Sequence, residues 1–291
     1  MNLREARELL AEQGYPVLFA LPSAPGRFEG GASYRIEIPS CEGPEVFKAV
    51  LDEAVERDVP VHRVSQGSGV MMLTDAEISE MVELGTDYGV EVCLFLGPRA
   101  AWDIGAQAKV SAAVASVARG NEMVAASLCD AFRAVELGIR SLLVGDLGVL
   151  QLLGDLKKSG YLPDDLVLKT SVLMPLTNGP TAALYQAAGA TSLNVSTDLP
   201  LSALAEIRAS VSVPIDLYVE APDDQGGAVR FYDVPQVIRV AAPVYLKMGL
   251  RNSPNIYPVG AHLAATAQAL GRERVRRAEL VLRLLAEQDE V

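Results

Sequence analysis

The sequence predicts a single (β/α)8 barrel of the TIM type, preceded by a helical extension. Eight short apolar runs of strand length follow one another at intervals of roughly 23 to 50 residues, and helix-like segments fill most of the intervals. The runs in the second half of the chain end in polar residues, as expected for strands whose carboxyl ends bind ligands. Half of the 291 residues are apolar, which is enough for one large core.

The extension is expected to cover residues 1–30 and the barrel residues 31–291. A helix is predicted at 2–13, where apolar residues recur on one face, and a turn-rich loop follows it. The first strand is the alternating run 34–38, which Pro39 ends. The seven further strands are expected at 59–64, 90–96, 140–144, 166–169, 192–195, 215–219 and 244–248.

Helices are expected at 44–57, 74–87, 123–137 and 261–287, besides Ala-rich segments between the later strands. Pro44 suits the first turn of a helix, and Thr74 with Glu77 has the spacing of a capping box. Residues 99–109, which hold the single tryptophan, are expected to be a loop. The alternative fold, an open doubly wound sheet, needs a glycine-rich phosphate loop after its first strand, and IPSCEGPE supplies none.

The composition excludes several classes of protein. A net charge of −12 argues against a nucleic-acid-binding surface and favours an acidic, well-solvated one. No run reaches the roughly 18 apolar residues that span a bilayer, and the amino terminus lacks the order of a signal peptide, so a cytoplasmic protein without membrane contact is expected. Three scattered cysteines and two isolated histidines predict neither a disulfide framework nor a Cys/His zinc site.

The carboxyl ends of the predicted strands offer the candidate site, because several strand ends of a barrel meet at one mouth. The residues expected there are Glu37, His62, Arg63, Gln66, Arg99, Asp146, Lys169, Ser171, Asn194, Ser196, Glu220, Lys247 and Arg251. Of these, His62, Glu220, Lys247 and Lys169 are the candidate catalytic residues. Candidate substrate-binding residues are Glu37, Arg63, Gln66, Arg99, Ser171, Asn194 and Arg251. The oxygens of Glu37, Asp146 and Glu220, with His62 as a fourth ligand, would suit a hard divalent ion.

Each reactive residue also has an ordinary structural interpretation. A lysine in an apolar strand is costly unless it is paired or deprotonated, so Lys169 and Lys247 are either ion-paired, for example Lys247 with Glu220, or suited to a Schiff base. His62 is either a general base or a hydrogen-bonded core residue. Cys41 would be a nucleophile only with a nearby base such as His62.

Three segments of the second half resemble the collagenase-like peptidases of unassigned catalytic type, class U, family 32. They are SLLVGDLGVLQLL, the block from TSVLMPLTNGP to PIDLYVEA, and YLKMGLRNSP, in which Lys247, Arg251, Ser253 and Pro254 match the family element. The resemblance implies a barrel with a mouth that uses Lys247 and Arg251. Where the family continues after its seventh strand with cysteines, this chain has Glu220-Ala221-Pro222, which makes an iron–sulfur cluster doubtful.

Three functions remain open from the sequence. The first is a barrel enzyme similar to that family, which hydrolyses a peptide-like or modified small substrate at the mouth. The second is a lyase or aldolase that acts through a Schiff-base lysine or a divalent metal ion. The third is a barrel that binds a ligand without turnover. The sequence leaves the substrate, the cofactor and a homo-oligomeric state undetermined.

Overall fold

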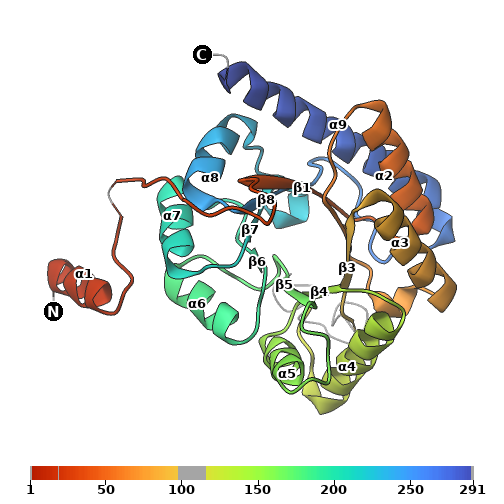
Figure 1. Ribbon diagram of the computed structural model, residues 1–291, viewed down its shortest axis with the longest axis horizontal. Helices are drawn as coiled ribbons and strands as arrows, with labels where there is room; N and C mark the ends of the chain where they lie inside the picture. Colours follow the sequence, from red (N-terminus) through yellow and green to blue (C-terminus); the bar gives the residue numbers. More distant parts are fainter. Residues whose placement is uncertain (1, 19, 98–115, 290–291) are drawn as a thin grey trace.

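A computed structural model describes residues 2–18, 20–97 and 116–289, and it confirms the predicted barrel. Eight parallel strands stand side by side in the order β5-β4-β3-β2-β1-β8-β7-β6 (Figure 1). Their bounds are β1 Tyr34–Pro39, β2 Arg63–Gln66, β3 Glu91–Phe95, β4 Ser141–Val144, β5 Val167–Thr170, β6 Leu193–Asn194, β7 Ile215–Glu220 and β8 Val244–Met248.

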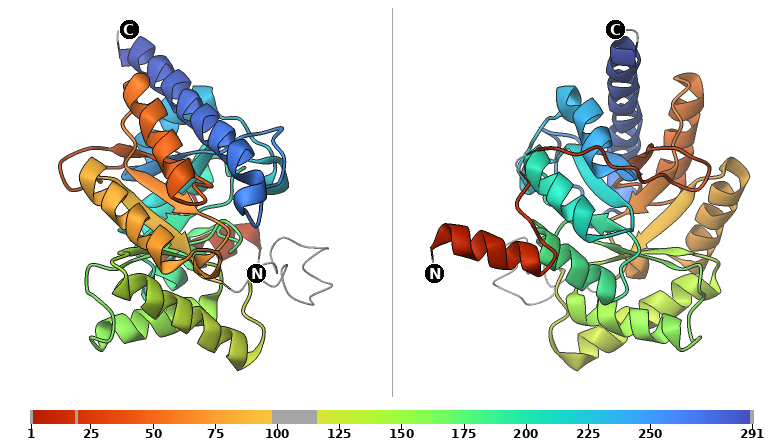
Figure 2. Two further views of the ribbon diagram at one scale, coloured as in Figure 1. Left: turned by 90° about the vertical axis from the view of Figure 1, so that its right-hand side faces the viewer. Right: turned by 60° about the vertical axis from the view of Figure 1, so that its left-hand side comes forward.

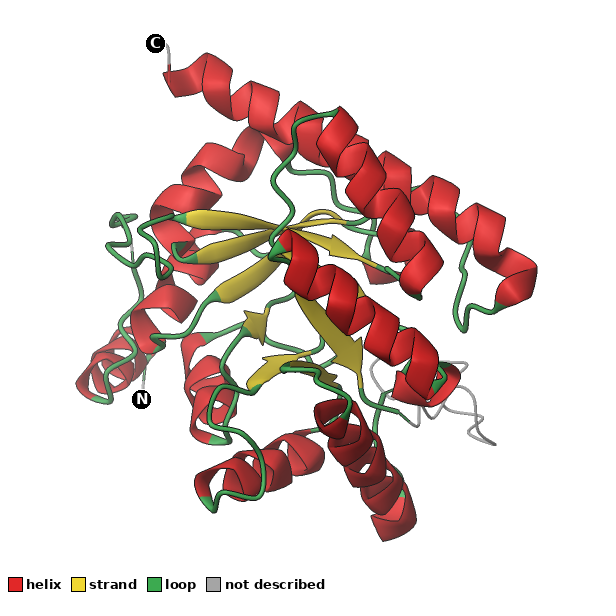
Figure 3. Ribbon diagram, turned by 45° about the vertical axis from the view of Figure 1, so that its right-hand side comes forward, coloured by secondary structure: helices red, strands yellow, loops and turns green. Residues whose placement is uncertain are grey.

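The helices form an outer ring around the strands, as Figure 3 shows. Their bounds are α2 Pro44–Glu56, α3 Asp75–Tyr88, α4 Gly120–Glu136, α5 Leu147–Lys158, α6 Gly179–Ala187, α7 Leu201–Ser210, α8 Val234–Ala241 and α9 Ala264–Asp289. The capping box predicted for α3 is present, since the Thr74 side chain accepts from the Glu77 N–H while Glu77 accepts from the Thr74 N–H. Helix α9 lies along α2 and covers β8 and β1.

The strand alternation separates an apolar outer face from a polar interior. Ile36 and Ile38 of β1 are fully buried in the hydrophobic layer between strands and helices. Glu37 lies between them in the sequence, so its side chain points to the opposite face, into the barrel. The apolar side chains Cys93, Phe95 and Leu143 form a second, small cluster on β3 and β4. The rest of the interior is therefore left to polar groups.

The barrel closes between β5 and β6 through an isolated bridge rather than a full ladder. Lys169 pairs with Ser192, and the N–H of Thr170 donates to the Ser192 carbonyl at 3.0 Å. Threonine hydroxyls replace missing backbone partners: Thr170 Oγ1 accepts from the Asn194 N–H at 2.9 Å, and Thr191 Oγ1 accepts from the Leu168 N–H at 2.8 Å. The backbone groups of this seam are thus satisfied although β6 has only two residues.

The amino-terminal segment runs along the end of the barrel where the strands begin. Helix α1, Leu3–Glu12, stands apart from the body beside α6 and α7 (Figures 1 and 2). Further on, the ring of Phe28 packs edge-on against Tyr245, with 4.9 Å between the ring centroids. The Arg35 guanidinium lies 4.5 Å from the centre of the Phe28 ring. These contacts close the amino end of the barrel, opposite the mouth.

Most predicted elements agree with the structure, and the clearest difference concerns β2. This strand begins at Arg63, whereas the sequence suggested residues 59–64. Pro60 has no N–H for a ladder, and the His62 N–H is the first to reach β1, where it donates to the Ile36 carbonyl at 3.0 Å. The expected loop at 99–109 lies outside the described residues. No helix in the described part of the chain has the length and hydrophobicity that crossing a membrane would require.

A close backbone contact between α5 and the turn before β6 depends on two glycines. Gly189 adopts a positive φ of 111°, and a Cβ on Gly154 would lie 2.5 Å from the Ala188 carbonyl oxygen. We expect Gly154→Ala to destabilise the fold by about 2 kcal/mol, because the backbone must move apart. Gly148→Ala in the same helix is the control. Its nearest neighbour is a side-chain oxygen of Asp146 at 3.2 Å, so a neutral effect or a gain of up to about 1 kcal/mol is expected.

Urea unfolding of both variants measures the difference between the two glycines. A Gly154→Ala protein as stable as Gly148→Ala would show that the backbone contact tolerates a methyl group.

Candidate functional site

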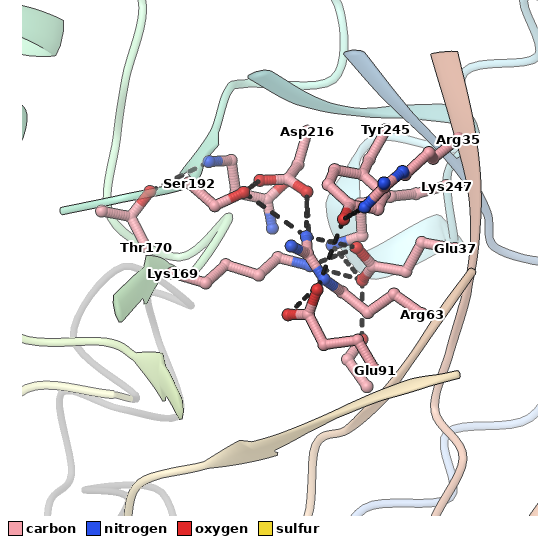
Figure 4. Close-up of polar contacts among 12 residues, drawn as sticks. Arg35, Glu37, Arg63, Glu91, Lys169, Thr170, Ser192, Asp216, Tyr245 and Lys247 are labelled. Carbon is pink, nitrogen blue, oxygen red and sulfur yellow. Dashed lines mark hydrogen bonds and ion pairs between the residues drawn. The ribbon is translucent and has the colours of Figure 1, made fainter. Parts of the chain in front are cut away.

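The interior of the barrel holds six charged side chains that balance each other. Three carboxylates face three cations, and each of them comes from a different strand. Figure 4 shows their side chains pointing toward one another. The carboxylates are Glu37, Glu91 and Asp216, and the cations are Arg63, Lys169 and Lys247. All except Glu91 are at most 2% exposed. Charged side chains that are buried this deeply need partners of opposite charge, and here the six charges sum to zero.

Glu37 is the anionic centre of this network. The ammonium of Lys169 contacts both of its carboxylate oxygens, Ser65 donates to it at 2.8 Å, and Lys247 lies 3.6 Å away. Burial acts to raise the pKa of Glu37, but the charges of Lys169, Lys247 and Arg63 outweigh it and hold that pKa well below the ordinary value. Glu37 is therefore a permanent anion that fixes the cations, and it is too weak a base for proton abstraction at neutral pH.

Arg63 joins the two other carboxylates. Its guanidinium donates to Asp216 at 2.7 Å and to Glu91 at 2.8 Å. It also stacks on Tyr245, with 3.6 Å between the guanidinium carbon and the ring centroid. Through Nε and Nη1 the guanidinium thus links carboxylates of three different strands, and Arg63 organises this part of the interior.

Lys247 of β8 is the register partner of Glu37 on β1. Its ammonium lies 4.1 Å from the centre of the Tyr218 ring. In the amide orientation that satisfies all its neighbours, Asn194 accepts from Lys247 at 2.8 Å and from the Val172 N–H at 3.2 Å. A carboxylate, an amide oxygen and an aromatic face all favour the charged ammonium. Burial raises the pKa of the Tyr218 phenol, so this hydroxyl stays protonated and can donate a hydrogen bond.

Tyr257 covers the rim of the mouth above β1 and β2. It lies in the segment between β8 and α9, and its hydroxyl contacts Ser40 Oγ. A side chain on Gly67 would collide with the Tyr257 ring, since a Cβ there would lie 2.7 Å from a ring carbon. Glu42 holds the neighbouring loop by accepting the N–H groups of Gly67 at 2.7 Å and Ser68 at 2.8 Å.

The structure does not place His62 at the mouth. It directly precedes β2 and therefore lies at the amino end of the barrel. Its Nδ1 accepts from the Ile36 N–H at 3.1 Å, and partial burial lowers its pKa. The proposed dyad with Cys41 is wrong for the same reason, because Cys41 follows β1 at the opposite end. Burial also raises the pKa of the Cys41 thiol, so no thiolate forms there.

The three carboxylates expected to hold a metal ion are not brought together. Glu37 is bound by Lys169, and Asp146 caps α5 by accepting the Val149 N–H at 2.9 Å. Glu220 lies next to a register shift in β7, and it pairs with Arg277 of α9 at 3.1 Å instead of with Lys247. Within the described residues no group of three His, Cys, Asp or Glu side chains could coordinate an ion. The structure thus leaves Glu37, Asp146 and Glu220 in three separate sets of contacts.

The other predicted binding residues have separate positions. Gln66 holds its own loop through two bonds with Gly69, and Ser171 accepts the Leu173 N–H at 3.2 Å. Arg251 is exposed at the rim, 3.8 Å from Asp223. Ser196 lies beyond β6, where its N–H donates to the Leu176 carbonyl. Arg99 lies outside the described residues. The group that the structure does bring together is Glu37, Arg63, Lys169, Asn194 and Lys247.

Sequence reasoning missed Asp216, Tyr218, Ser192 and Tyr245, all of which belong to this interior. The available signal was the alternation in IDLYVE and VYLKM, where every second residue is polar or a tyrosine. The predicted site was drawn from the carboxyl ends of these runs, so their middle positions are absent from it.

Comparisons with known proteins agree with this architecture. The family model of peptidase family U32 matches residues 102–221, which confirms the resemblance over that part of the chain. A search of the curated proteins gave no match.

Among solved structures, a CutC protein from Streptococcus agalactiae, named for copper homeostasis, has a TM-score of 0.50 at 12% identity. The alignment covers 73% of this chain and 98% of that one. A U32 peptidase has a TM-score of 0.46 at 16% identity, over 79% of this chain and 97% of that one. A protein from Burkholderia cenocepacia named as a lyase or mutase has a TM-score of 0.46 at 13% identity, covering 86% and 81%. At these identities the likeness concerns the fold alone.

Proposed function

Starting from a TIM barrel whose residues 102–221 match peptidase family U32, we propose that the chain is an enzyme acting on a small carbonyl compound. The substrate, of amide or ester type, binds at the carboxyl ends of the strands, above Lys247 and Tyr218. The observation that carries this proposal is the Lys247 ammonium, which Glu37, Asn194 and Tyr218 hold beneath the mouth. Active sites of TIM barrels lie at this end of the strands.

The chemistry follows from the charge state of these groups. When water adds to a carbonyl carbon, the carbonyl oxygen gains negative charge. The protonated Tyr218 hydroxyl donates to that oxygen, and the buried ammonium of Lys247 stabilises the charge through the low-dielectric interior. The carbon–nitrogen or carbon–oxygen bond then breaks, and water supplies the hydroxyl of the acid and the proton of the leaving group.

A Schiff-base mechanism fits these contacts less well. A lysine that forms a Schiff base must first lose its proton. The nitrogen of Lys247 is engaged by a carboxylate, an amide oxygen and an aromatic face, and its attack on a carbonyl carbon would have to break these contacts.

The test is a panel of peptides, amides and esters incubated with the purified protein and analysed by mass spectrometry. We expect consumption of at least one compound with addition of one water. Tyr218→Phe, which removes one oxygen atom, is expected to lower kcat about 100-fold, because it removes a donor to the oxyanion. Lys247→Met is expected to cause a loss of similar size.

The control is Tyr161→Phe, because Tyr161 is 71% exposed and remote from the mouth. Near-ultraviolet circular dichroism checks that each variant is folded. Trapping of a carbonyl substrate on Lys247 by borohydride would replace the hydrolytic proposal with a lyase mechanism. Consumption of none of the panel would contradict hydrolysis, and unchanged turnover in both variants would contradict the assigned site.

A further inference from the structure

Arg274 of α9 is a buried arginine without a hydrogen-bond partner for two of its nitrogens. The residue is 4% exposed, and neither Nε nor Nη1 has a partner among the described residues. Leaving the N–H groups of a buried guanidinium unpaired is one of the more costly arrangements in a protein interior. A bound ligand that accepts hydrogen bonds from these N–H groups would explain why they have no partner in the described part of the protein.

The neighbouring arginine on the same face of α9 shows what Arg274 lacks. Arg277, three residues further on, has the carboxylate of Glu220 at 3.1 Å as an ion-pair partner, although its Nε also makes no hydrogen bond within the described part of the chain. The one carboxylate among the groups that act on the charge of Arg274 is that of Glu42, and its two oxygens accept the N–H groups of Gly67 and Ser68. The Glu42 carboxylate therefore acts on the charge of Arg274 while its oxygens accept hydrogen bonds from the backbone of the Gly67 loop.

The groups that surround the charge of Arg274 come from the carboxyl ends of the strands. The groups that act on its charge are Tyr257, Tyr218, Glu42 and Cys41. They come from the segment after β8, from β7 and from the turn after β1, all at the carboxyl end of the strands. The charges of Arg274 and Glu37 both act on the phenol of Tyr218, and the Tyr218 ring lies 4.1 Å from the Lys247 ammonium, so Tyr218 stands between the guanidinium and the proposed reaction centre.

From this geometry we infer that Arg274 is the anchor of an oxyanion-binding subsite at the mouth, which takes a carboxylate or phosphate group. Its free N–H groups supply the donors, because guanidinium groups match the oxygen atoms of both kinds of anion. The protonated Tyr218 hydroxyl adds a further donor. Where it concerns the substrate, this inference rests on the proposed function. It then implies that the substrate is a small carbonyl compound that carries an anionic group.

Anion binding can be measured without turnover, so the subsite and the proposed reaction can fail independently. Thermal unfolding is followed in phosphate, acetate and chloride, each at tens of millimolar and at matched ionic strength. At a concentration about tenfold above Kd, a bound oxyanion is expected to raise Tm by about 3 °C relative to chloride. A rise with phosphate alone assigns a phosphate group, and a rise with acetate alone assigns a carboxylate.

The decisive variant is Arg274→Gln, with Arg276→Gln as its matched control. Arg276 lies on the same helix, but its side chain is 43% exposed and paired with Glu273. We expect the oxyanion-dependent rise to vanish in Arg274→Gln and to remain in Arg276→Gln. In chloride, Arg274→Gln should melt no lower than the wild type, because the guanidinium has no bond there to lose. If the role of Arg274 were purely structural, Arg274→Gln would instead melt at a lower temperature than the wild type in chloride.

Two outcomes overturn the inference. One is a wild-type protein whose Tm is the same in all three salts. The other is an equal rise in all three proteins, which would mean that the anions act on the general surface. If Arg274→Gln does not fold, Arg274→Lys keeps the charge but loses the fork, and its Kd is expected to rise at least tenfold. An unchanged Kd in that variant would also contradict the subsite.

Discussion

Replacing Arg63 by methionine is expected to lower the free energy of unfolding by about 4 kcal/mol, which is a large part of the stability of a typical domain. The substitution keeps most of the volume but removes the partner of two carboxylates. Asp216 is fully buried and would retain only the Ser192 hydroxyl and the more distant Lys169, 3.6 Å away. Glu91 would lose its bond of 2.8 Å. A buried charge without its partner is costlier than the complete pair.

Urea unfolding followed by circular dichroism measures this loss. The control is Arg283→Met, because the Arg283–Glu287 pair on α9 is exposed and its side chains are 3.7 Å apart. That variant is expected to change stability by less than about 0.5 kcal/mol. Adding Asp216→Asn to Arg63→Met should recover part of the loss, since it removes the orphaned charge. Equal stability of Arg63→Met and Arg283→Met would show that the interior network is not organised around Arg63.

Lys169→Met is expected to cost about 3 kcal/mol, for a related reason. Lys169 and Glu37 are both fully buried, and their contact crosses the barrel from β5 to β1. The loss should be smaller than for Arg63, because Glu37 keeps Arg63 at 3.4 Å and Lys247 at 3.6 Å. The double variant with Glu37→Gln is expected to be more stable than Lys169→Met alone, because the remaining charges again balance more closely.

The same pair gives the protein a specific dependence on acid. Folding lowers the pKa of Glu37 from its ordinary value of 4.5, because Lys169, Lys247 and Arg63 outweigh the effect of burial. The contribution of Glu37 to stability is therefore fully present above pH 4.5, and it is lost as the pH falls below that value toward the lowered pKa. In Lys169→Met this acid-dependent loss should become smaller. Urea unfolding at a series of pH values down to pH 3 measures it, and an unchanged slope in the variant would contradict the assignment.

Local patterns were sufficient for most secondary structure. The capping box at Thr74 and the proline in the first turn of α2 depend on neighbouring residues alone, and both are present. The strand β8 has the bounds that its apolar run predicted. The beginning of β2 was misplaced, because Val59 and Val61 have strand-forming side chains while the ladder with β1 and β3 sets the actual start.

The candidate site was predicted less completely than the fold. Glu37, Arg63, Lys169, Asn194 and Lys247 were named from the sequence and do meet in the barrel. Asp146 and Glu220 were expected to join them, but a helix cap and an ion pair with α9 hold them elsewhere. Asp216 and Tyr218 were not predicted, because the site was sought at the carboxyl ends of the strands and the alternation within IDLYVE was not used.

The sequence by itself determined the barrel, since hydrophobic periodicity and local capping act over a few residues and are visible in the chain. Only the tertiary structure decided which charges neutralise each other, because Glu37 and Lys169 are 132 positions apart and Arg63 and Asp216 are 153 apart. Closure of the strands brings these groups into a space that excludes water, and there the energy of each charge depends on its partners. The same closure leaves Arg274 at the mouth with N–H groups that no residue of the described chain accepts.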